Sequence, residues 1–338
     1  MDYTQTKFYG LSNKKYLAKL LYMDKAKLRN VSKEYTPIKF ESEVNGKTRI
    51  LYDQQPEYKK ILKKIVNLLY KIGVPEYAFG GIKKRNYIDN AKVHKDNKFL
   101  LILDISNFFP STSDSFVYNL FYNKLEMEPD IAKILTNLVT VPLEKGEGRY
   151  LPQGFPTSPI MSLLAYIDMY EEIAEIAEKN NLKFSCYYDD FTLSSNKFIS
   201  KSLKKSISRI IQKYGFKVHP KKSKLMIKRY TKVTGVIVEE GNIKAPKSLF
   251  KKLHEAFNML KIMDKQKESY LFEDYINVCN KVQGLIAAIK SIEPNRNLKM
   301  YSNMLKYMRK KYDIPYRKIS ISSSFKTPEA KLIGTNKS

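Results

Sequence analysis

Three aspartates stand at positions where carboxylates could bind metal. Asp104 follows the apolar run at residues 99–103, and the pair Asp189-Asp190 interrupts an aromatic and apolar stretch at residues 186–195. A buried carboxylate is unfavourable unless a partner neutralises its charge. Taken singly, Asp104 could cap a loop and the pair could sit in a solvated turn. Taken together, three carboxylates could form the all-oxygen site that Mg²⁺ prefers.

The adjacency of the pair restricts how it could reach such a site. Successive residues of a strand face opposite ways, so Asp189 and Asp190 can share one site only at the tip of a hairpin. Asp104 on the neighbouring strand would then complete the cage. Two Mg²⁺ ions held there could clamp the attacking and leaving oxygens of a phosphoryl transfer, which is what a nucleotidyl transferase requires.

Two further motifs offer groups that could hold a substrate. In the loop LPQGFPTSP at residues 151–159, Gln153 and Gly154 precede a predicted helix start, and the backbone there could support a sugar, a base or a template strand. Lys47 and Arg49 lie on a predicted hairpin and could grip a triphosphate. The alternatives are an ordinary Gly/Pro loop and solvated surface charges.

The periodicity of the apolar residues predicts the elements that carry these groups. Helices are predicted at residues 11–23, 56–73, 158–180 and 200–215, twice within 114–140, and over most of 247–311. The helix at 158–180 is expected to be capped at Ser158-Pro159. Strands are predicted at 38–52 (a hairpin turning at Asn45-Gly46), at the start of 99–111, around the aspartate pair, and at 224–228 and 233–238.

The charge balance points to a polyanionic partner. The chain of 338 residues has 61 Lys and Arg against 34 Asp and Glu, a net charge of +27. Such an excess suits nucleic acid or an anionic membrane. The membrane is disfavoured because no apolar run approaches the length of a span and the first residues resemble neither a signal peptide nor a lipidation motif. The two cysteines form no spacing pattern, which predicts a reduced cytoplasmic protein. The three histidines are isolated in the sequence, which disfavours a zinc site.

In this order the motifs resemble the reverse transcriptase family. The resemblance runs from the basic hairpin through LDxxxFFPS (103–111), LPQGxPTSP (151–159) and YxDD (187–190) to GFxVxPKKSK (215–224). Asn90 to His94 matches the NAxxH signature of bacterial retron reverse transcriptases, and Val233-Thr234-Gly235 matches their VTG signature. Taken alone, His94 could be a histidine satisfied within the fold and Gly235 a strand bulge.

The resemblance implies an α+β fold of the right-hand polymerase type. The N-terminal helix and fingers would span 1–98, the palm 99–245 with a fingers insert at about 114–150, the helical thumb 246–315 and a flexible tail 316–338. It also implies an RNA-directed DNA polymerase that copies part of a partner noncoding RNA into single-stranded DNA. Priming from a 2′-hydroxyl of that RNA would give a branched product, in a system of anti-phage defence.

Site roles follow from the resemblance, residue by residue. The catalytic residues would be Asp104, Asp189 and Asp190, and two Mg²⁺ ions would be held by Asp104, Ile105, Asp189 and Asp190. The nucleotide would contact Lys47, Arg49, Phe109, Gln153 and Gly154, with the Phe109 ring lying under the sugar. Template, primer or RNA would contact Tyr187, Tyr188, Lys221, Lys222, Asn90, His94, Val233, Thr234 and Gly235.

Two positions depart from the retron pattern. Retron sequences usually have Ala where this chain has Phe155 and Tyr188, and both changes are expected to add bulk near the primer terminus or the nucleotide. The expected partners are the cognate noncoding RNA, the RNA–DNA product, dNTPs, a separate effector protein and a host ribonuclease H, with no membrane. The alternatives are another bacterial reverse transcriptase, group II intron-like or defence-associated, and a non-catalytic RNA-binding scaffold.

Overall fold

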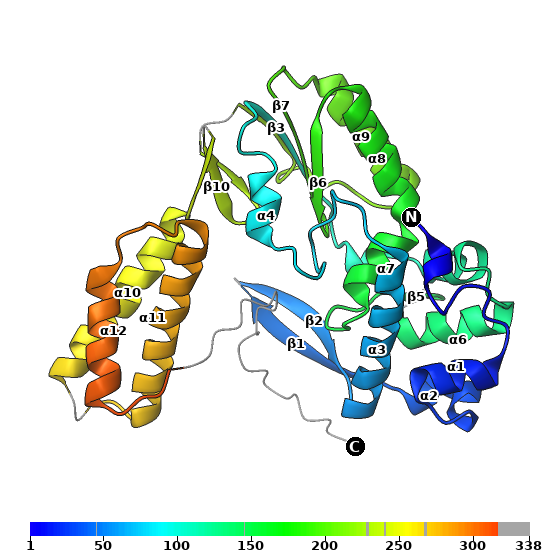
Figure 1. Cartoon of the computed structure of the whole chain (residues 1–338), viewed down its shortest axis with the longest axis horizontal. Helices are drawn as coiled ribbons and strands as arrows, with labels where there is room; N and C mark the ends of the chain where they lie inside the picture. Colours follow the sequence, from blue (N-terminus) through cyan, green and yellow to red (C-terminus); the bar gives the residue numbers. More distant parts are fainter. Residues whose placement is uncertain (45, 145, 228–229, 240, 267–268, 317–338) are drawn as a thin grey trace.

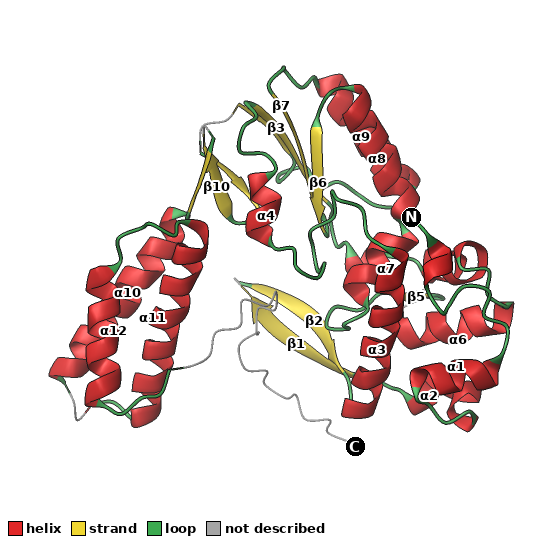
Figure 2. Cartoon of the chain, in the orientation of Figure 1, coloured by secondary structure: helices red, strands yellow, loops and turns green. Residues whose placement is uncertain are grey.

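The computed structural model describes residues 1–316 apart from 45, 145, 228–229, 240 and 267–268. Figure 1 shows a larger body of helices and strands, with a separate bundle of long helices beside it. Figure 2 shows that the strands are confined to the larger body and to the segment leading into the bundle. The predicted tail at 316–338 lies outside the described residues, apart from residue 316.

The central sheet carries the predicted aspartates. It is antiparallel with strand order β6-β7-β3-β8. The strands are β3 (Phe99–Asp104), β6 (Lys183–Tyr187), β7 (Asp190–Ser195) and β8 (Lys224–Ile227). The middle strands β3 and β7 are mostly buried, because elements cover both faces of the sheet. Double coverage explains why residues 99–103 form a continuous apolar run instead of alternating with polar residues.

Most helices of the larger body lie close to predicted positions, whereas α2 (Val31–Glu34) and α4 (Tyr87–Lys92) were not predicted from the sequence. The bounds of the others are α1 Lys14–Leu21, α3 Pro56–Leu69, α5 Asp114–Asn119, α6 Pro129–Val139, α7 Ser158–Ala165, α8 Ile167–Lys179 and α9 Lys201–Lys213. The Asn13 side chain caps α1 by accepting from Lys15 N at 2.8 Å. Pro56 occupies the first position of α3. A short 3-10 turn at residues 70–72 follows the helix and ends at Gly73, whose φ is +89°.

The single helix predicted at 158–180 is wrong, because the chain breaks at Tyr166 between α7 and α8. The Tyr166 ring stacks on Phe116 at 4.5 Å, and its hydroxyl accepts a hydrogen bond from Ser113 N at 2.7 Å. The predicted cap is also shifted by one residue. Thr157 occupies the cap position, and the Ser158 hydroxyl donates to the Pro152 carbonyl at 2.6 Å. A contact with a distant segment accompanies the break at Tyr166, whereas the shifted cap involves a hydrogen bond within the LPQG loop itself.

The predicted basic hairpin is confirmed and lies against the LPQG loop. Its strands are β1 (Ile38–Val44) and β2 (Lys47–Asp53), which pair antiparallel over their full length. Tyr52 N donates to Gln153 O at 2.8 Å. A Cβ on Gly154, whose φ is +106°, would stand 2.3 Å from Tyr52 O, so only glycine permits this approach. Two short strands, β4 (Val141–Pro142) and β5 (Arg149–Tyr150), precede the loop.

The helical C-terminal segment forms its own packed unit. The prediction of helix over most of 247–311 is confirmed by α10 (Lys247–Lys265), α11 (Phe272–Ile292) and α12 (Lys299–Lys311). A small sheet of β9 (Thr231–Val233), β10 (Val236–Glu239) and β11 (Asn242–Lys244) joins them to the larger body. The single strand predicted at 233–238 is wrong, because Thr234 and Gly235, with φ +43° and +92°, form a turn between β9 and β10.

Candidate active site

The sheet brings the three aspartates to one edge. Asp104 and Asp190 are direct partners across β3 and β7, and Ile105 N donates to Asp189 O at 3.0 Å. Tyr188 at the head of the turn has φ +56°, a left-handed conformation that reverses the chain between β6 and β7. The predicted hairpin tip is therefore present. Asp104 and the aspartate pair, which begins 85 positions later in the sequence, become immediate neighbours.

The aspartates perturb each other electrostatically. Burial, with the Asp104 carboxylate nearby, raises the pKa of Asp189 to about 6. Burial followed by the charges of Asp189 and Asp104 also raises the pKa of Asp190. Neighbouring carboxyl groups that are shielded from water are difficult to ionise at the same time, because their negative charges repel each other. The arrangement therefore favours a bound cation, which would stabilise all three carboxylates in their charged form.

The loop after α9 supplies positive charge to Asp104. Lys222 Nζ lies 2.8 and 2.7 Å from the two Asp104 carboxylate oxygens. His219 N donates to Asp104 O at 2.7 Å, and the Ser223 hydroxyl accepts from Asp104 N at 3.2 Å. Lys222 thus contacts the carboxylate of Asp104, a candidate catalytic residue, and its predicted contact with template or primer stays a prediction, as does that of the exposed Lys221.

The residues fit a divalent cation by chemistry, although their side chains are not arranged around one point. Three carboxylates at one edge, with raised pKa values at Asp189 and Asp190, are a suitable set of hard oxygen ligands. Among the described residues no group of three His, Cys, Asp or Glu side chains has metal-binding geometry. Asp104 is turned towards Lys222 instead. Ile105 can contribute only its main chain, because its side chain is buried in the core.

The predicted nucleotide contacts lie on three different elements. Arg49 is exposed on β2, and its charge opposes the rise in the pKa of Asp189, so the hairpin faces the carboxylates. The Lys47 backbone lies on the same strand, and its side chain is outside the described part. Gln153 is half-buried in the loop beside the hairpin. Phe109 is half-buried and follows Asp104 by five residues.

Phe155 does not add bulk towards the substrate, which corrects the expectation from the sequence. Its side chain is buried and packs edge-on against Tyr58 of α3, with ring centroids 5.4 Å apart. The Tyr188 ring is half-buried and tilted against Phe109, with ring centroids 6.0 Å apart, so its predicted position near the nucleotide stays a prediction. The larger side chain at position 155 fills the core between α3 and the LPQG loop.

Asn90 and His94 are positioning residues, and their predicted direct contact with RNA is wrong because both are fully buried. His94 Nδ1 lies 2.7 Å from Ser194 Oγ, and Nε2 lies 2.7 Å from Ser185 Oγ. The ring therefore joins α4 to both strands of the aspartate hairpin. The reading of His94 as satisfied within the fold is the correct one.

The two retron signatures meet in space. Asn90 Nδ2 donates to Thr234 Oγ1 at 3.3 Å, and the Thr234 hydroxyl donates to Tyr87 O at 2.9 Å. Val233 is buried and cannot contact RNA, which corrects its predicted role. Thr234 and Gly235 are partly exposed, and their RNA contact stays a prediction. Through this contact α4 links the aspartate hairpin to the turn that leads into the bundle.

A profile of one family matches most of this region. It is described as reverse transcriptase (RNA-dependent DNA polymerase), and it matches residues 36–238, which is more than half of the chain. The chain belongs to the reverse transcriptase family. It is therefore an RNA-directed DNA polymerase with the α+β polymerase fold that its sequence predicts. The motif aspartates of this reverse transcriptase are those gathered at the sheet edge.

Curated relatives of this reverse transcriptase are retron enzymes. Retron Se72 reverse transcriptase of Salmonella heidelberg (strain 579083-10) is 28% identical over 276 residues, covering 78% of this chain and 70% of the relative. Retron Ec86 reverse transcriptase of Escherichia coli is 25% identical over 276 residues, 78% of each. Retron Ec48 reverse transcriptase of Escherichia coli is 22% identical over 298 residues, covering 83% and 72%.

Two solved structures are similar at a lower level. Telomerase from Candida albicans with a TWJ fragment of telomeric RNA has a TM-score of 0.46 and 12% identity, covering 83% of this chain and 64% of that one. The foamy viral protease–reverse transcriptase with double-stranded DNA has a TM-score of 0.41 and 16% identity, covering 82% and 43%.

Sequence reasoning missed the glycine pair that packs against the turn between β6 and β7, which carries Asp189. A Cβ on Gly80 would lie 2.4 Å from Tyr188 N, and one on Gly81 would lie 2.8 Å from the Tyr188 hydroxyl. Arg85 holds this segment by donating to the carbonyl of Ala78 at 2.6 Å. The adjacent glycines were a visible signal, but nothing local indicates which backbone approaches them.

We expect His94→Ala to destabilise the protein, because the buried Ser185 hydroxyl loses its imidazole partner, whereas Ser194 Oγ keeps its hydrogen bond from Asn97 Nδ2. A buried group left unsatisfied costs roughly 1–3 kcal/mol, so the melting temperature should fall by about 5 °C in scanning fluorimetry. The matched control is His254→Ala, since His254 is exposed on α10. Equal melting temperatures for the two variants would contradict the positioning role of His94.

Proposed function

We propose that this reverse transcriptase is of the retron type and copies part of a partner noncoding RNA into single-stranded DNA. A 2′-hydroxyl of that RNA serves as the primer, so the product is a branched RNA–DNA molecule. The observation that most directly supports polymerisation is the pairing of Asp104 with Asp190, beside Asp189. The retron assignment is supported by the named relatives and by the contact between Asn90 and Thr234, which joins the two signature motifs.

In the proposed mechanism, the aspartates hold two Mg²⁺ ions, with Ile105 contributing its main chain. When bound, these ions lower the pKa of the attacking hydroxyl and stabilise the charge that develops on the transferred phosphoryl group. Arg49 on the facing hairpin binds the triphosphate, because a guanidinium pairs well with phosphate oxygens. The LPQG loop, fixed by the close approach of Gly154 to Tyr52, supports the base pair.

Lys222 has a second role in this proposal. Its ammonium neutralises Asp104 in the structure, at 2.7 Å from the carboxylate. Its side chain is about half exposed, so it can turn towards a phosphate when a cation binds Asp104. The lysine therefore keeps three neighbouring carboxylates compatible with folding and remains available to the nucleic acid.

The domain organisation that we propose keeps the boundaries expected from the motifs. The fingers span 1–98, the palm 99–245 with an insert at 114–150, and the thumb 246–315. One large hydrophobic core underlies the first two parts, and a second core underlies the thumb. Ile88 and Leu100 belong to the second core, so α4 and β3 support the base of the thumb.

The cognate RNA binds to the thumb and to the turn at Thr234 in this proposal. The net charge of +27 supports a polyanionic partner, and basic helices suit the shape and loops of A-form RNA. Within the described chain no helix is long and apolar enough to cross a membrane. The proposed setting is the cytoplasm, where a separate effector acts in anti-phage defence and a host ribonuclease H removes the template.

Sequencing the nucleic acid that copurifies with the full chain tests the retron assignment. We expect one RNA species and DNA complementary to part of it, joined through a 2′–5′ branch that a debranching enzyme releases. Linear complementary DNA without a branch would support the alternative of another bacterial reverse transcriptase. Copurified RNA without any DNA would support a binding scaffold.

Asp104→Asn, Asp189→Asn and Asp190→Asn should each abolish DNA synthesis, because each removes a charged ligand from the metal site. Primer extension with Mg²⁺ measures the loss, and a gel-shift assay should show that RNA binding persists. The control is Asp168→Asn, since Asp168 pairs with Lys124 on the surface away from the site. Extension by Asp190→Asn at the wild-type rate would refute the assignment.

Binding of the copurified RNA should weaken steeply with salt, because lysine and arginine contacts release counterions from the phosphates. Titration at several salt concentrations should give a linear fall of log affinity against log salt. A charge-reversal variant of exposed thumb lysines, Lys251→Glu with Lys252→Glu, should lower both the affinity and the slope. An affinity that does not vary with salt would contradict RNA binding by distributed charges.

Phe109→Ala should raise ribonucleotide incorporation, because the ring leaves no room for a 2′-hydroxyl under the sugar. A tenfold change corresponds to about 1.4 kcal/mol of discrimination. Single-nucleotide extension with dNTP and rNTP measures it, beside a melting curve. The control is Phe108→Ala, whose buried ring packs on Phe216 and whose loss should cost roughly 3–5 kcal/mol of stability without selective gain. An unchanged preference in folded Phe109→Ala would remove Phe109 from the site.

A further inference from the structure

A row of aromatic rings connects the proposed sugar site to the catalytic turn. The Phe109 ring lies 5.2 Å from Phe108 on one side and 6.0 Å from Tyr188 on the other. Tyr188 in turn contacts Tyr187 at 5.1 Å. Phe108 is buried, whereas Phe109 and its neighbour Tyr188 are both only half-buried. The position of the Tyr188 ring therefore affects how Phe109 is held.

The Tyr188 ring occupies a seat that exists because residues 80 and 81 have no side chains. A Cβ on Gly81 would lie 2.8 Å from the Tyr188 hydroxyl and 2.9 Å from its Cε1. A Cβ on Gly80 would lie 2.9 Å from Tyr188 Cγ. The whole length of the ring thus lies against the backbone of the glycine pair. Burial in this seat raises the pKa of the Tyr188 hydroxyl above its ordinary value.

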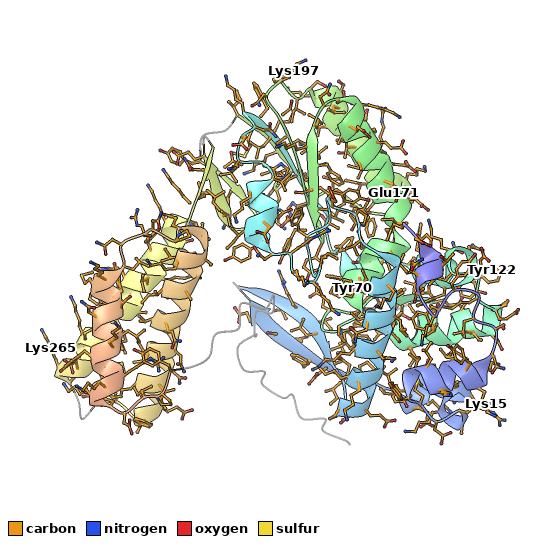
Figure 3. All side chains as sticks on the ribbon, in the orientation of Figure 1. Lys15, Tyr70, Tyr122, Glu171, Lys197 and Lys265 are labelled. Carbon is orange, nitrogen blue, oxygen red and sulfur yellow. The ribbon has the colours of Figure 1, made fainter. Side chains whose placement is uncertain are left out.

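The seat is held in place by bonds to its neighbours. The hydroxyl of Tyr70, which Figure 3 labels, donates to Gly81 O at 2.6 Å. Phe79 N donates to Cys186 O at 2.9 Å, and Cys186 N donates to Tyr77 O at 2.8 Å. The segment that contains the glycines is therefore joined to β6, the strand that leads into the catalytic turn. Ring and seat are parts of one connected structure.

We propose that Tyr188 is a positioning residue for sugar selection. The seat formed by Gly80 and Gly81 holds the Tyr188 ring against Phe109. Phe109 thereby keeps the orientation that excludes a 2′-hydroxyl. This inference rests on the proposed role of Phe109. It also explains how a tyrosine is accommodated at a position next to the catalytic aspartates, since Gly81 and Tyr188 form a matched pair.

Single-nucleotide extension by the full chain on a primed RNA template tests the proposal. The variants are Phe109→Ala, Tyr188→Ala, Tyr188→Phe and the double variant Phe109→Ala with Tyr188→Ala. We expect Tyr188→Ala to lower the dNTP-over-rNTP selectivity about tenfold or less, and Tyr188→Phe to retain it because the ring remains. The double variant should lose no more selectivity than Phe109→Ala alone, because Tyr188 acts through Phe109.

The outcomes separate this inference from the proposed function. If Phe109→Ala lowers selectivity and folded Tyr188→Ala does not, the inference is overturned and the sugar site stands. If Phe109→Ala leaves selectivity unchanged, the sugar site and the inference fail together. If the two single-variant losses of selectivity multiply in the double variant, Tyr188 acts independently of Phe109, and the inference is also overturned. The control is Phe198→Ala, an aromatic residue 73% exposed at the other end of the sheet, and it should leave selectivity unchanged.

A second experiment tests the seat itself. Gly81→Ala is compared in the wild-type and Tyr188→Ala backgrounds, because strain at φ +68° and the contact with Pro159 at 2.5 Å are common to both. We expect Gly81→Ala to reduce selectivity more in the wild-type background, where the tyrosine ring is displaced. Equal effects in the two backgrounds would refute the seat. Gly73→Ala controls for strain alone, since Gly73 has φ +89° and its Cβ would meet nothing within 4 Å.

Discussion

The rest of the structure depends on holding three carboxylates together at one sheet edge. Their mutual repulsion, added to burial, raises the pKa values of Asp189 and Asp190, so the arrangement is unfavourable without nearby positive charge. Lys222 supplies part of that charge by direct contact, and Arg49 supplies part across the site. A cation that binds the carboxylates would relieve the same repulsion, which is why the chemistry of these residues suits the metal-dependent nucleotidyl transfer that we propose.

The polar contacts around α4 explain how such a strained edge keeps its shape. His94 joins both strands of the aspartate hairpin through Ser185 and Ser194, and Asn90 reaches the turn at Thr234. Buried polar networks of this kind favour one arrangement because each lost partner is costly. The retron signatures in this chain therefore act first as internal connections between the sheet and the base of the bundle. The RNA contact that we propose for this region would involve its exposed residues, such as Thr234 and Gly235.

Close packing at glycines also helps to fix the position of the loops around the aspartates. Gly154 lets the LPQG loop touch Tyr52, and Gly80-Gly81 lets the catalytic turn lie on its neighbouring segment. Both contacts place a loop within a distance that any Cβ would prevent. The fingers hairpin, the loop and the turn are thus registered to one another through glycines. The substrate contacts that we propose depend on this registration, since each comes from a different element.

The sequence by itself determined the aspartates, the hairpins, most helices and the order of the motifs, because these depend on local periodicity, turn residues and residue type. Two examples are the strand that ends at Asp104 and the turn after Tyr187. The apolar run at 99–103 predicts the strand, and the adjacent pair Asp189-Asp190 predicts the turn. The tertiary structure alone decided the break at Tyr166, the inward direction of Phe155, the burial of His94 and the seat of Tyr188. Each of these depends on a contact between segments distant in the chain, and no local pattern specifies which segments will meet.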